Sequence, residues 1–326
     1  MASWNVYVTR QIPDAGLKLL RDAGIDFDMN PHDRVLTRDE LLAGVRGRDA
    51  VLCLLTDTID AEVLDASRGA RIFANYAVGF NNVDVAAATE RGVLVTNTPG
   101  VLTDTTADMA WALMFAAGRR IAEADRFTRA GKFEGWGPML LLGQDITGAT
   151  LGIVGPGRIG TAVAQRAKGF NMRVLIAGPD PSEEILGIAD EQVSLDELLR
   201  ESDFVSLHVP LVKETHHLIG ERELQLMKPT AYLINTSRGP VVDEKALVHA
   251  LRDHVIAGAG LDVFEDEPAL APGLAELENV VIAPHIASAT NATRSKMATM
   301  AAENLLAGLR GETPPNLVNP EVLAKR

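Results

Sequence analysis

Three apolar runs of the sequence are each followed at once by side chains that can bind a carboxylate or move a proton. Arg238 follows "AYLINTS", an acidic group that includes Asp262 and Glu267 lies in "AGAGLDVFEDEP", and His285 follows "VVIAP". A guanidinium can hold a carboxylate through two parallel hydrogen bonds. Histidine transfers protons near neutral pH, and a carboxylate beside it favours its protonated form and fixes its orientation. Taken singly, each could also be a surface arginine, a solvated acidic loop or a histidine without function.

A glycine-rich turn predicts a site for a dinucleotide. In "TLGIVGPGRIGTAVAQRAKGF" an apolar strand runs into Gly155, Gly157 and Gly160, and a helical pattern follows directly. The first glycine permits the tight turn, the second admits the pyrophosphate to the backbone, and the third allows close packing of helix on strand. The phosphates would then meet the positive end of the helix. Arg158 could contact a phosphate or stay solvated.

The segment "VLIAGPDP" departs from this fingerprint, because an acidic residue is expected there to bind the ribose hydroxyls of NAD. Gly178 stands at the turn, and the first acid is Asp180. Residues 174–199 contain seven acidic residues and neither Lys nor Arg. An additional 2′-phosphate needs a cation or several donors. We therefore expect NAD rather than NADP, with Asp180 or backbone groups at the ribose.

The elements that must position these residues alternate between short apolar runs and helical patterns. This alternation indicates parallel βαβ units in two doubly wound α/β domains. We expect long helices over residues 103–132 and 293–310. Because the last helix needs a sheet to cover, we expect a Rossmann-type cofactor domain (residues 100–288) inserted into a flavodoxin-like substrate domain (residues 1–99 and 289–326). The expected strands are "NVYVT", "AVLCLLT", "RIFANYAVG", "VLVTN", "LGIVG", "RVLIAG", "FVSLHVP", "AYLINTS", "IAGAGLDVF" and "VVIAPH".

Composition excludes several other classes of protein. The 326 residues are 47% hydrophobic and 23% charged, with a net charge of −13, which disfavours nucleic acid and anionic membranes as partners. The single cysteine, Cys53, rules out an internal disulfide. The apolar run "MAWALMFAAG" is far shorter than the ~18 residues of a spanning helix, and "MASWNVYVTR" lacks a signal-peptide core, so a cytoplasmic protein is expected. His208, His216 and His217 lack metal-ligand spacing, so no metal site is predicted.

These segments together resemble the D-isomer-specific 2-hydroxyacid dehydrogenases over nearly the whole chain. The resemblance rests on "ANYAVGFNNVD", "GVLVTNTPGVLTDTTADMAWAL", "GIVGPGRIGTAVAQRAKGFNMRV", "INTSRGPVVDEKAL", "AGAGLDVFEDEP" and "APHIASAT". Within the family, "NYAVGFNNVD", "RAKGFNMR" and "PPNLVNPEV" are most similar to the glyoxylate/hydroxypyruvate reductase branch. Pro156 and Ala287 depart from the family pattern at backbone positions near the cofactor.

The resemblance implies a role for each reactive residue. His285 would be the general acid that protonates the carbonyl oxygen, and Glu267 would pair with it. Arg238 would bind the substrate carboxylate, whose other end would meet the backbone amides of Val78 and Gly79. Leu55 and, from a second subunit, Trp136 would border the substrate.

The resemblance also implies the cofactor contacts, with Asp262 at the nicotinamide carboxamide and the loop from His208 to Pro210 along the adenine. It further implies a homodimer formed through the segment around residues 100–146, and the alternative for "GWGPMLLLGQDI" is a linker buried within one subunit. The expected cofactor-binding residues are Thr106, Gly155, Gly157, Arg158, Ile159, Gly160, Asp180, His208, Pro210, Thr215, Thr236, Arg238, Asp262, His285 and Ser288.

The expected function is therefore hydride transfer between NAD(H) and a small 2-keto or 2-hydroxy acid, most of all reduction of glyoxylate or hydroxypyruvate. Two alternatives remain open at this point. One is a related dehydrogenase acting on D-lactate, 3-phosphoglycerate or phosphite. The other is a binding protein of the co-repressor type that senses the nucleotide without catalysis.

Overall fold

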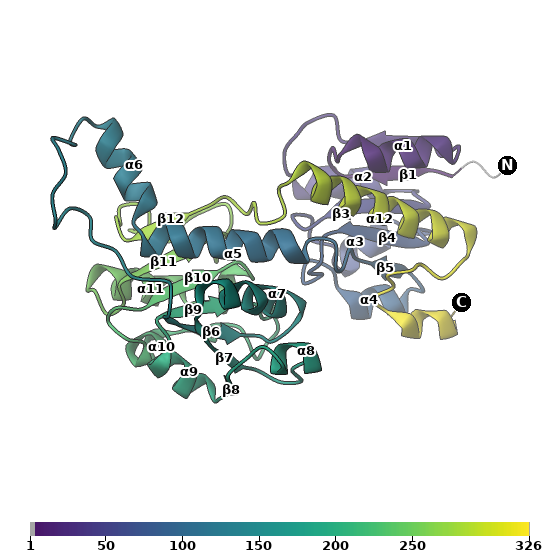
Figure 1. Cartoon of the computed structure of the whole chain (residues 1–326). Coiled ribbons are helices and arrows are strands. Elements are labelled where there is room, and N and C mark those ends of the chain that lie inside the picture. The colour runs from purple at the N-terminus through teal and green to yellow at the C-terminus, as the bar shows by residue number, and fades with distance from the viewer. Residues whose placement is uncertain (1–3, 326) are drawn as a thin grey trace. The chain divides into compact units, whose positions relative to one another are not determined.

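The apolar runs form two separate parallel sheets, each covered by helices on both faces (Figure 1). The computed structural model describes residues 4–325. One unit combines the residues up to Leu102 with those from Ser288 onward, and the other comprises Thr103–Ala287. The predicted fold class, two doubly wound α/β domains, is confirmed.

The split unit contains a five-stranded sheet in the order β2-β1-β3-β4-β5. This is the strand order of flavodoxin-like folds. Its strands are β1 (Val6–Val8), β2 (Phe27–Met29), β3 (Ala50–Leu54), β4 (Ile72–Tyr76) and β5 (Leu94–Thr96). Its helices are α1 (Asp14–Asp22), α2 (Arg38–Val45), α3 (Ala61–Ala66), α4 (Val85–Glu90) and α12 (Asn291–Arg310), and a 3-10 segment spans Pro320–Lys325.

Alternation along β3 explains how this sheet forms two cores. Ala50 and Leu52 pack with α1 and α12, whereas Val51 and Cys53 pack with α2, α3 and α4. Helix α12 closes the first of these cores, as its sequence predicts. It begins two residues before the expected start because the side chain of Thr290 caps it, accepting a hydrogen bond from the amide of Thr293 at 3.2 Å.

The second unit contains a seven-stranded sheet in the order β12-β11-β10-β9-β6-β7-β8. The strands are β6 (Thr150–Val154), β7 (Arg173–Ala177), β8 (Glu191–Gln192), β9 (Phe204–Leu207), β10 (Tyr232–Asn235), β11 (Gly258–Leu261) and β12 (Val280–Ile282). The helices are α5 (Thr103–Gly118), α6 (Ile121–Arg129), α7 (Arg158–Ala167), α8 (Glu183–Leu186), α9 (Leu195–Glu201), α10 (Glu221–Leu226) and α11 (Glu244–Arg252), with 3-10 turns at Lys168–Phe170 and Gly239–Val241. Six of the strands follow the Rossmann order, and β12 extends it by one.

Two features of the sequence-based prediction are wrong in detail. The helix expected over residues 103–132 is divided into α5 and α6, because Arg120 adopts a left-handed conformation with φ 56° and its guanidinium pairs with Glu123 at 2.8 Å. Strands β2 and β8 were not expected. Both lie at sheet edges and are short. Strand β8 consists of two exposed polar residues, and in β2 the exposed Asp28 separates the half-buried Phe27 and Met29, so neither contains the apolar run that marks a central strand. Among the helices of the described residues, none combines the length and apolar character needed to span a membrane.

Candidate active site

The reactive side chains singled out in the sequence lie at one edge of the seven-stranded sheet. Gly155 follows β6, His208 follows β9, Thr236 follows β10 and Asp262 follows β11, while His285 comes three residues after β12. All of these strands are parallel, so their carboxyl ends meet at the same edge, where open α/β sheets bind ligands.

His285 and Glu267 form a hydrogen-bonded pair at this edge. The imidazole Nδ1 lies 2.9 Å from Glu267 Oε2, and Glu267 Oε1 accepts a hydrogen bond from the amide of Phe264 at 3.0 Å. Burial by itself would raise the pKa of Glu267, but the hydrogen bond and charge of His285 outweigh it, helped by the Phe264 amide and Arg238, so the pKa is lowered. With Nδ1 bound to the carboxylate, Nε2 is the ring atom left for a ligand.

The buried carboxylate of Asp262 determines where His285 lies. Its two oxygens accept hydrogen bonds from the amides of Ile286 and Ala287, both at 2.8 Å, and its carbonyl oxygen accepts one from the amide of His285 at 2.9 Å. His285 adopts a left-handed conformation with φ 54°. Burial raises the pKa of Asp262, although the two amides and His285 oppose this effect. Asp262 therefore connects the end of β11 to the turn that carries the histidine.

Arg238 is positioned by the last residue of its own strand. Asn235 donates a hydrogen bond to the carbonyl of Arg238 at 3.0 Å and accepts one from the amide of Ser237 at 3.0 Å. The guanidinium donates to the carbonyl of Ser237 at 2.7 Å. Burial lowers the pKa of Arg238, and the charge of Glu267 opposes this effect. Both Arg238 and His285 thus interact with the same glutamate.

Gly239 allows the loop that carries Arg238 to approach the loop that carries Glu267. A Cβ atom on Gly239 would lie 1.8 Å from the carbonyl oxygen of Phe264 and 2.4 Å from the nitrogen of Glu265. Only glycine fits at such a distance, so the sequence "SRGP" keeps the two loops in contact.

The start of α7 has the features that a phosphate group requires. Its N-cap is Gly157, and no side chain among the described residues caps the helix there. A Cβ on Gly157 would meet nothing within 4 Å, whereas Cβ atoms on Gly155 and Gly160 would lie 2.7 Å from the carbonyl carbon of His208 and 2.3 Å from the oxygen of Gly155, respectively. Free amides and open space above them suit an anion.

Other expected cofactor residues, namely His208, Thr215 and Thr236, lie in the loops after β9 and β10 at the same edge. The hydroxyl of Thr236 is buried and has no hydrogen-bond partner within residues 4–325. His208 bonds through Nε2 to Ser206 at 2.8 Å, and removal of water lowers its pKa to about 3, so the ring is neutral. Thr215 donates to the carbonyl of Pro210 at 2.6 Å and shapes that loop. Thr106 is buried in α5.

The two departures from the glycine fingerprint lie in contact with each other. A Cβ on Gly178 would be 2.6 Å from Cδ of Pro156, and Gly178 has a φ of 138° that only glycine adopts readily. The acidic residue expected after β7 is therefore excluded by the proline ring. Asp180 is exposed and left-handed, with φ 48°.

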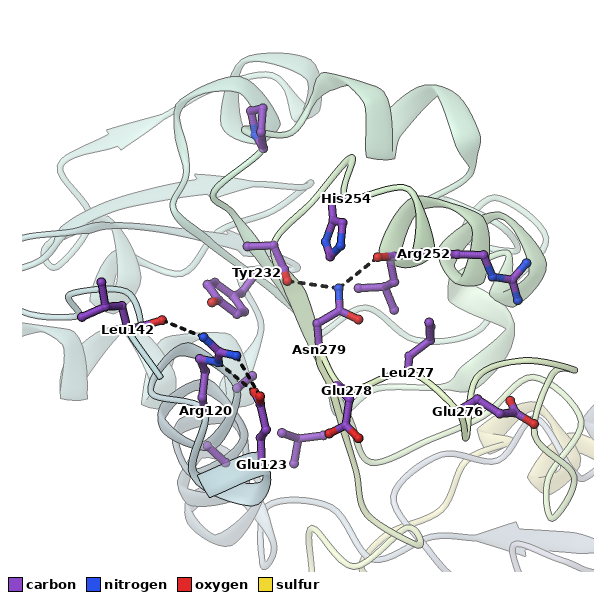
Figure 2. A pocket seen from close by; sticks show the side chains of 16 residues that line it. Arg120, Glu123, Leu142, Tyr232, Arg252, His254, Glu276, Leu277, Glu278 and Asn279 are labelled. Carbon is purple, nitrogen blue, oxygen red and sulfur yellow. Dashed lines mark hydrogen bonds and ion pairs between the residues drawn. The ribbon is translucent and has the colours of Figure 1, made fainter. Parts of the chain in front are cut away.

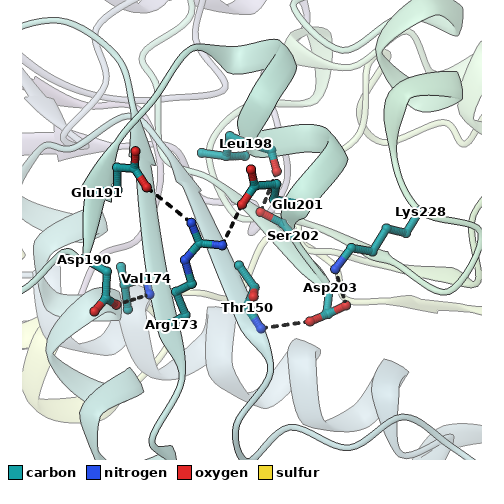
Figure 3. Close-up of polar contacts among 10 residues, drawn as sticks. All are labelled: Thr150, Arg173, Val174, Asp190, Glu191, Leu198, Glu201, Ser202, Asp203 and Lys228. Carbon is teal, nitrogen blue, oxygen red and sulfur yellow. Dashed lines mark hydrogen bonds and ion pairs between the residues drawn. The ribbon is translucent and has the colours of Figure 1, made fainter.

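The basic residue nearest to this turn in sequence is Arg173, which lies at the opposite edge of the sheet because it begins β7; Figure 3 shows its ion pairs and that of Lys228. Arg173 begins β7 and pairs with Glu201 at 2.6 Å and Glu191 at 3.3 Å. Lys228 pairs with Asp203 at 2.7 Å. A strand of five residues is roughly 16 Å long, so Arg173 and the turn at Gly178 are well separated.

The residues expected to bind substrate in the split unit follow its strands in the same way. Val78 and Gly79 come two and three residues after β4, and Leu55 follows β3. Asn75 donates to the carbonyl of Gly79 at 3.0 Å, and Asn97 donates to that of Val78 at 2.8 Å. These two asparagine side chains hold the loop in one conformation.

Trp136 lies in a long segment after α6 and is 85% exposed. The interpretation of residues 135–146 as a buried linker is therefore wrong.

Ser288 begins the second part of the split unit.

A cavity of about 580 Å³ lies near the amino ends of β10 and β12, away from the edge that carries His285 (Figure 2). Several of its polar groups already have hydrogen-bond partners. The Arg120 guanidinium pairs with Glu123 and donates to the carbonyl of Leu142 at 3.3 Å, and the Asn279 amide donates to backbone carbonyls at 3.0 and 3.2 Å.

Sequence reasoning missed the asparagines that shape the loops, and it missed one histidine cluster. Asn235 and Asn75 lie inside or at the end of apolar strands, and a polar residue at such a position was the available signal. His216 and His217 lie with Glu265, and the ligand atoms of the three residues are all within 4.8 Å of one another. No spacing in the sequence brings residue 265 to this pair.

Comparisons with known proteins show the family to which the chain belongs. The family model described as "D-isomer specific 2-hydroxyacid dehydrogenase, NAD binding domain" matches residues 111–287. A glyoxylate reductase from Korarchaeum cryptofilum is 56% identical over 327 residues, which cover 98% of this chain and 97% of that protein.

Solved structures match over similar lengths. A protein from Thermus thermophilus superposes with a TM-score of 0.91 at 47% identity, covering 96% of this chain and 99% of that one. An NADPH-dependent glyoxylate/hydroxypyruvate reductase from Sinorhizobium meliloti, solved with NADP and malonate, has a TM-score of 0.85 at 32% identity and covers 98% of each chain.

The lowered pKa of Glu267 predicts how its contribution to stability depends on pH. A carboxylate with a depressed folded-state pKa stabilises the fold fully above its ordinary value of 4.5, and this contribution is lost as the pH falls through the folded pKa. Glu267→Gln should therefore lower the urea midpoint at about pH 7 and do so less at about pH 3.5. The exposed Glu276→Gln serves as the control and should change neither midpoint. If Glu267→Gln lowered the urea midpoint equally at both pH values, the stabilising interaction between the Glu267 carboxylate and His285 would be contradicted.

Proposed function

Because the chain belongs to the D-isomer-specific 2-hydroxyacid dehydrogenase family, we propose that it reduces glyoxylate or hydroxypyruvate with a nicotinamide dinucleotide. The observation that carries this proposal is the His285–Glu267 pair, which lies with Arg238 at the edge of the sheet that also holds the glycine turn. Acid, carboxylate binder and phosphate-binding turn are the three parts that the reaction requires. We assign cofactor binding to the unit of residues 103–287 and substrate binding to the split unit.

The cofactor would be held by the turn from Gly155 to Gly160, the loop from His208 to Thr215 and the buried hydroxyl of Thr236. The uncapped start of α7 and the unpartnered Thr236 hydroxyl, both judged within residues 4–325, support this assignment. Asp262, Thr106 and Ser288 complete the proposed contacts. When bound, the nicotinamide supplies or accepts the hydride.

The protein's own residues would supply the proton and bind the substrate. His285 donates the proton from Nε2 to the carbonyl oxygen, because Nδ1 is bound by Glu267. Arg238 binds the carboxylate and stabilises the negative charge that develops on the carbonyl oxygen. We propose Val78, Gly79 and Leu55 as the substrate-binding residues of the split unit.

We predict that His285→Ala lowers kcat for NADH-dependent glyoxylate reduction by about 10²–10⁴-fold, the range typical of losing a general acid. NADH binding should be unchanged, because the side chain is removed without altering the glycine turn. Loss of NADH absorbance and quenching of NADH fluorescence measure the two quantities. His249→Ala, on the exposed surface of α11, is the matched control.

A panel containing glyoxylate, hydroxypyruvate, pyruvate and phosphohydroxypyruvate, with phosphite and NAD⁺ as a separate assay, separates the related dehydrogenase activities. Turnover with none of these substrates, despite tight NADH binding, would instead identify a nucleotide-sensing binding protein. Full activity of His285→Ala would refute its role as the acid.

We further propose that the enzyme prefers NADH to NADPH. The turn after β7 is followed by acidic residues and by no Lys or Arg as far as residue 199, and the Arg173 that precedes it is paired with carboxylates at the other end of the strand. A 2′-phosphate at this turn would meet negative charge without a compensating cation from this segment. The alternative is a preference for NADPH, because the related Sinorhizobium meliloti protein is NADPH-dependent.

The expected kcat/KM is at least about tenfold higher with NADH than with NADPH. Asp180→Asn should reduce this ratio, because asparagine tolerates the left-handed backbone of residue 180 and removes its charge. Glu276→Gln, outside the turn, should leave it unchanged. A higher kcat/KM with NADPH in the wild-type enzyme would overturn the proposal.

We also propose that two chains associate through the segment around residues 100–146. Helix α6 has no buried residue, and the segment after it is largely exposed. Patches of this kind on a folded protein mark association surfaces. Its large apolar residues exposed by more than half are Ile121, Phe133, Trp136, Met139 and Leu142.

Light scattering should give a dimer mass for the wild type, and Met139→Glu combined with Leu142→Glu should give a monomer. The two charges would have to be buried without a partner in the dimer interface. Leu186→Glu, at a leucine that is 48% exposed, is the control and should stay dimeric. A monomeric wild type would contradict the proposal.

A further inference from the structure

Two histidines and one glutamate that the proposed reaction does not use gather where the loops after β9 and β11 meet. His216 and His217 belong to the loop after β9, and Glu265 belongs to the loop after β11. One ligand atom from each of the three lies within 4.8 Å of the other two. The closest pair is His217 Nε2 and Glu265 Oε1, which are 2.7 Å apart.

The backbone at His217 brings both rings to one side of the loop. In an extended chain, successive side chains point in opposite directions. His217 instead has a φ of 52°, and the ring centroids of His216 and His217 lie 4.1 Å apart with an angle of 32° between the ring planes. The amide of His217 donates to the carbonyl of Pro240 at 2.8 Å, and that of Ile219 donates to Val241 at 3.1 Å. The two rings are therefore presented by an anchored segment.

Glu265 is also held before any ligand binds. Its Oε2 accepts a hydrogen bond from the amide of Glu244 at 3.2 Å, which leaves Oε1 toward His217. The close approach of Gly239 to the nitrogen of Glu265 restricts the backbone of this loop. The side chains of His217 and Glu265 are 36% and 24% exposed, so an ion from solvent can reach them.

We propose that His216, His217 and Glu265 form a binding site for a divalent transition-metal ion, with Zn²⁺ the best match. Two imidazole nitrogens and one carboxylate oxygen are a ligand set that zinc prefers, whereas Mg²⁺ and Ca²⁺ prefer oxygen alone. With bonds of about 2.0 Å, tetrahedral ligands lie roughly 3.3 Å apart, so His217 and Glu265 separate slightly to admit the ion. Three protein ligands leave one position for water.

The bound ion would connect the loop after β9 to the loop that carries Glu267. Glu265 and Glu267 are two residues apart in the same loop, and Glu267 holds His285. The bound ion would thus connect the cofactor-binding loop to the loop that positions the general acid. None of its three ligands is a residue proposed to bind the cofactor or to act in proton transfer.

Titration calorimetry of the untagged, chelator-stripped protein with ZnCl₂ tests this proposal directly and needs no substrate. The wild type should bind one saturable equivalent per chain. His216→Asn, His217→Asn and Glu265→Gln should each weaken binding by at least about tenfold. The control is His254→Asn, because His254 shares the left-handed backbone with φ 53° but lies outside the cluster. Asparagine tolerates the left-handed conformation of residues 217 and 254, so neither substitution strains the backbone.

Binding of Co²⁺ gives an independent spectroscopic test. It can be read on the wild type and the control alone, so it does not depend on whether the ligand variants fold. The wild type with one equivalent of CoCl₂ should show the intense visible bands of four- or five-coordinate Co²⁺, and His254→Asn should show them too. Absence of saturable Zn²⁺ binding to the wild type, a six-coordinate aqua-like Co²⁺ spectrum, or equal loss of binding in His254→Asn would each overturn the proposal.

Discussion

The buried carboxylate of Asp262 is the constraint on which the candidate site depends. Burying a carboxylate is costly unless it is hydrogen-bonded, and both oxygens here receive backbone amides from the turn after β12. This turn has few other ways to satisfy those amides, because β12 has ended and no further strand pairs with it within residues 4–325. The position of His285 therefore follows from the end of β11, one strand away. Glu267, later in the same β11 loop, can then bind its ring.

Close backbone contacts tie the remaining loops to this arrangement. Gly239 brings the loop after β10 against Phe264, so Arg238 and Glu267 belong to one packed structure. The pair of Pro156 and Gly178 acts in the same way between the turns after β6 and β7. In the sequence these are two unrelated departures from a fingerprint, but in the structure the ring of one occupies the space of a side chain on the other. A change at either position therefore has to be considered with its neighbour.

The sequence predicts those parts of the fold that depend on apolar periodicity, and it fails where a single backbone angle decides. The strands β9, β10 and β11 are buried along their length, and β6 is buried after its first residue, so their apolar runs are clear. The division between α5 and α6 depends on the left-handed Arg120, and no residue type required it. In the same way, the reactive residues were predicted because each follows an apolar strand. The cluster at His217 was not, because it needs both a left-handed residue and the packing of Glu265, which is 48 residues away in the sequence.

In both units, asparagine side chains hold the functional loops in place without a bound ligand. A strand that ends at a functional loop leaves backbone groups without a sheet partner, and these need hydrogen bonds when they are buried. Asn235 supplies a donor to Arg238 and an acceptor to Ser237, while Asn75 donates to Gly79. Aspartate could not replace either residue, because it lacks the donor that reaches the carbonyl oxygen. Loops held in this way keep their ligand-facing groups in place before binding, so less ordering is required when the ligand arrives.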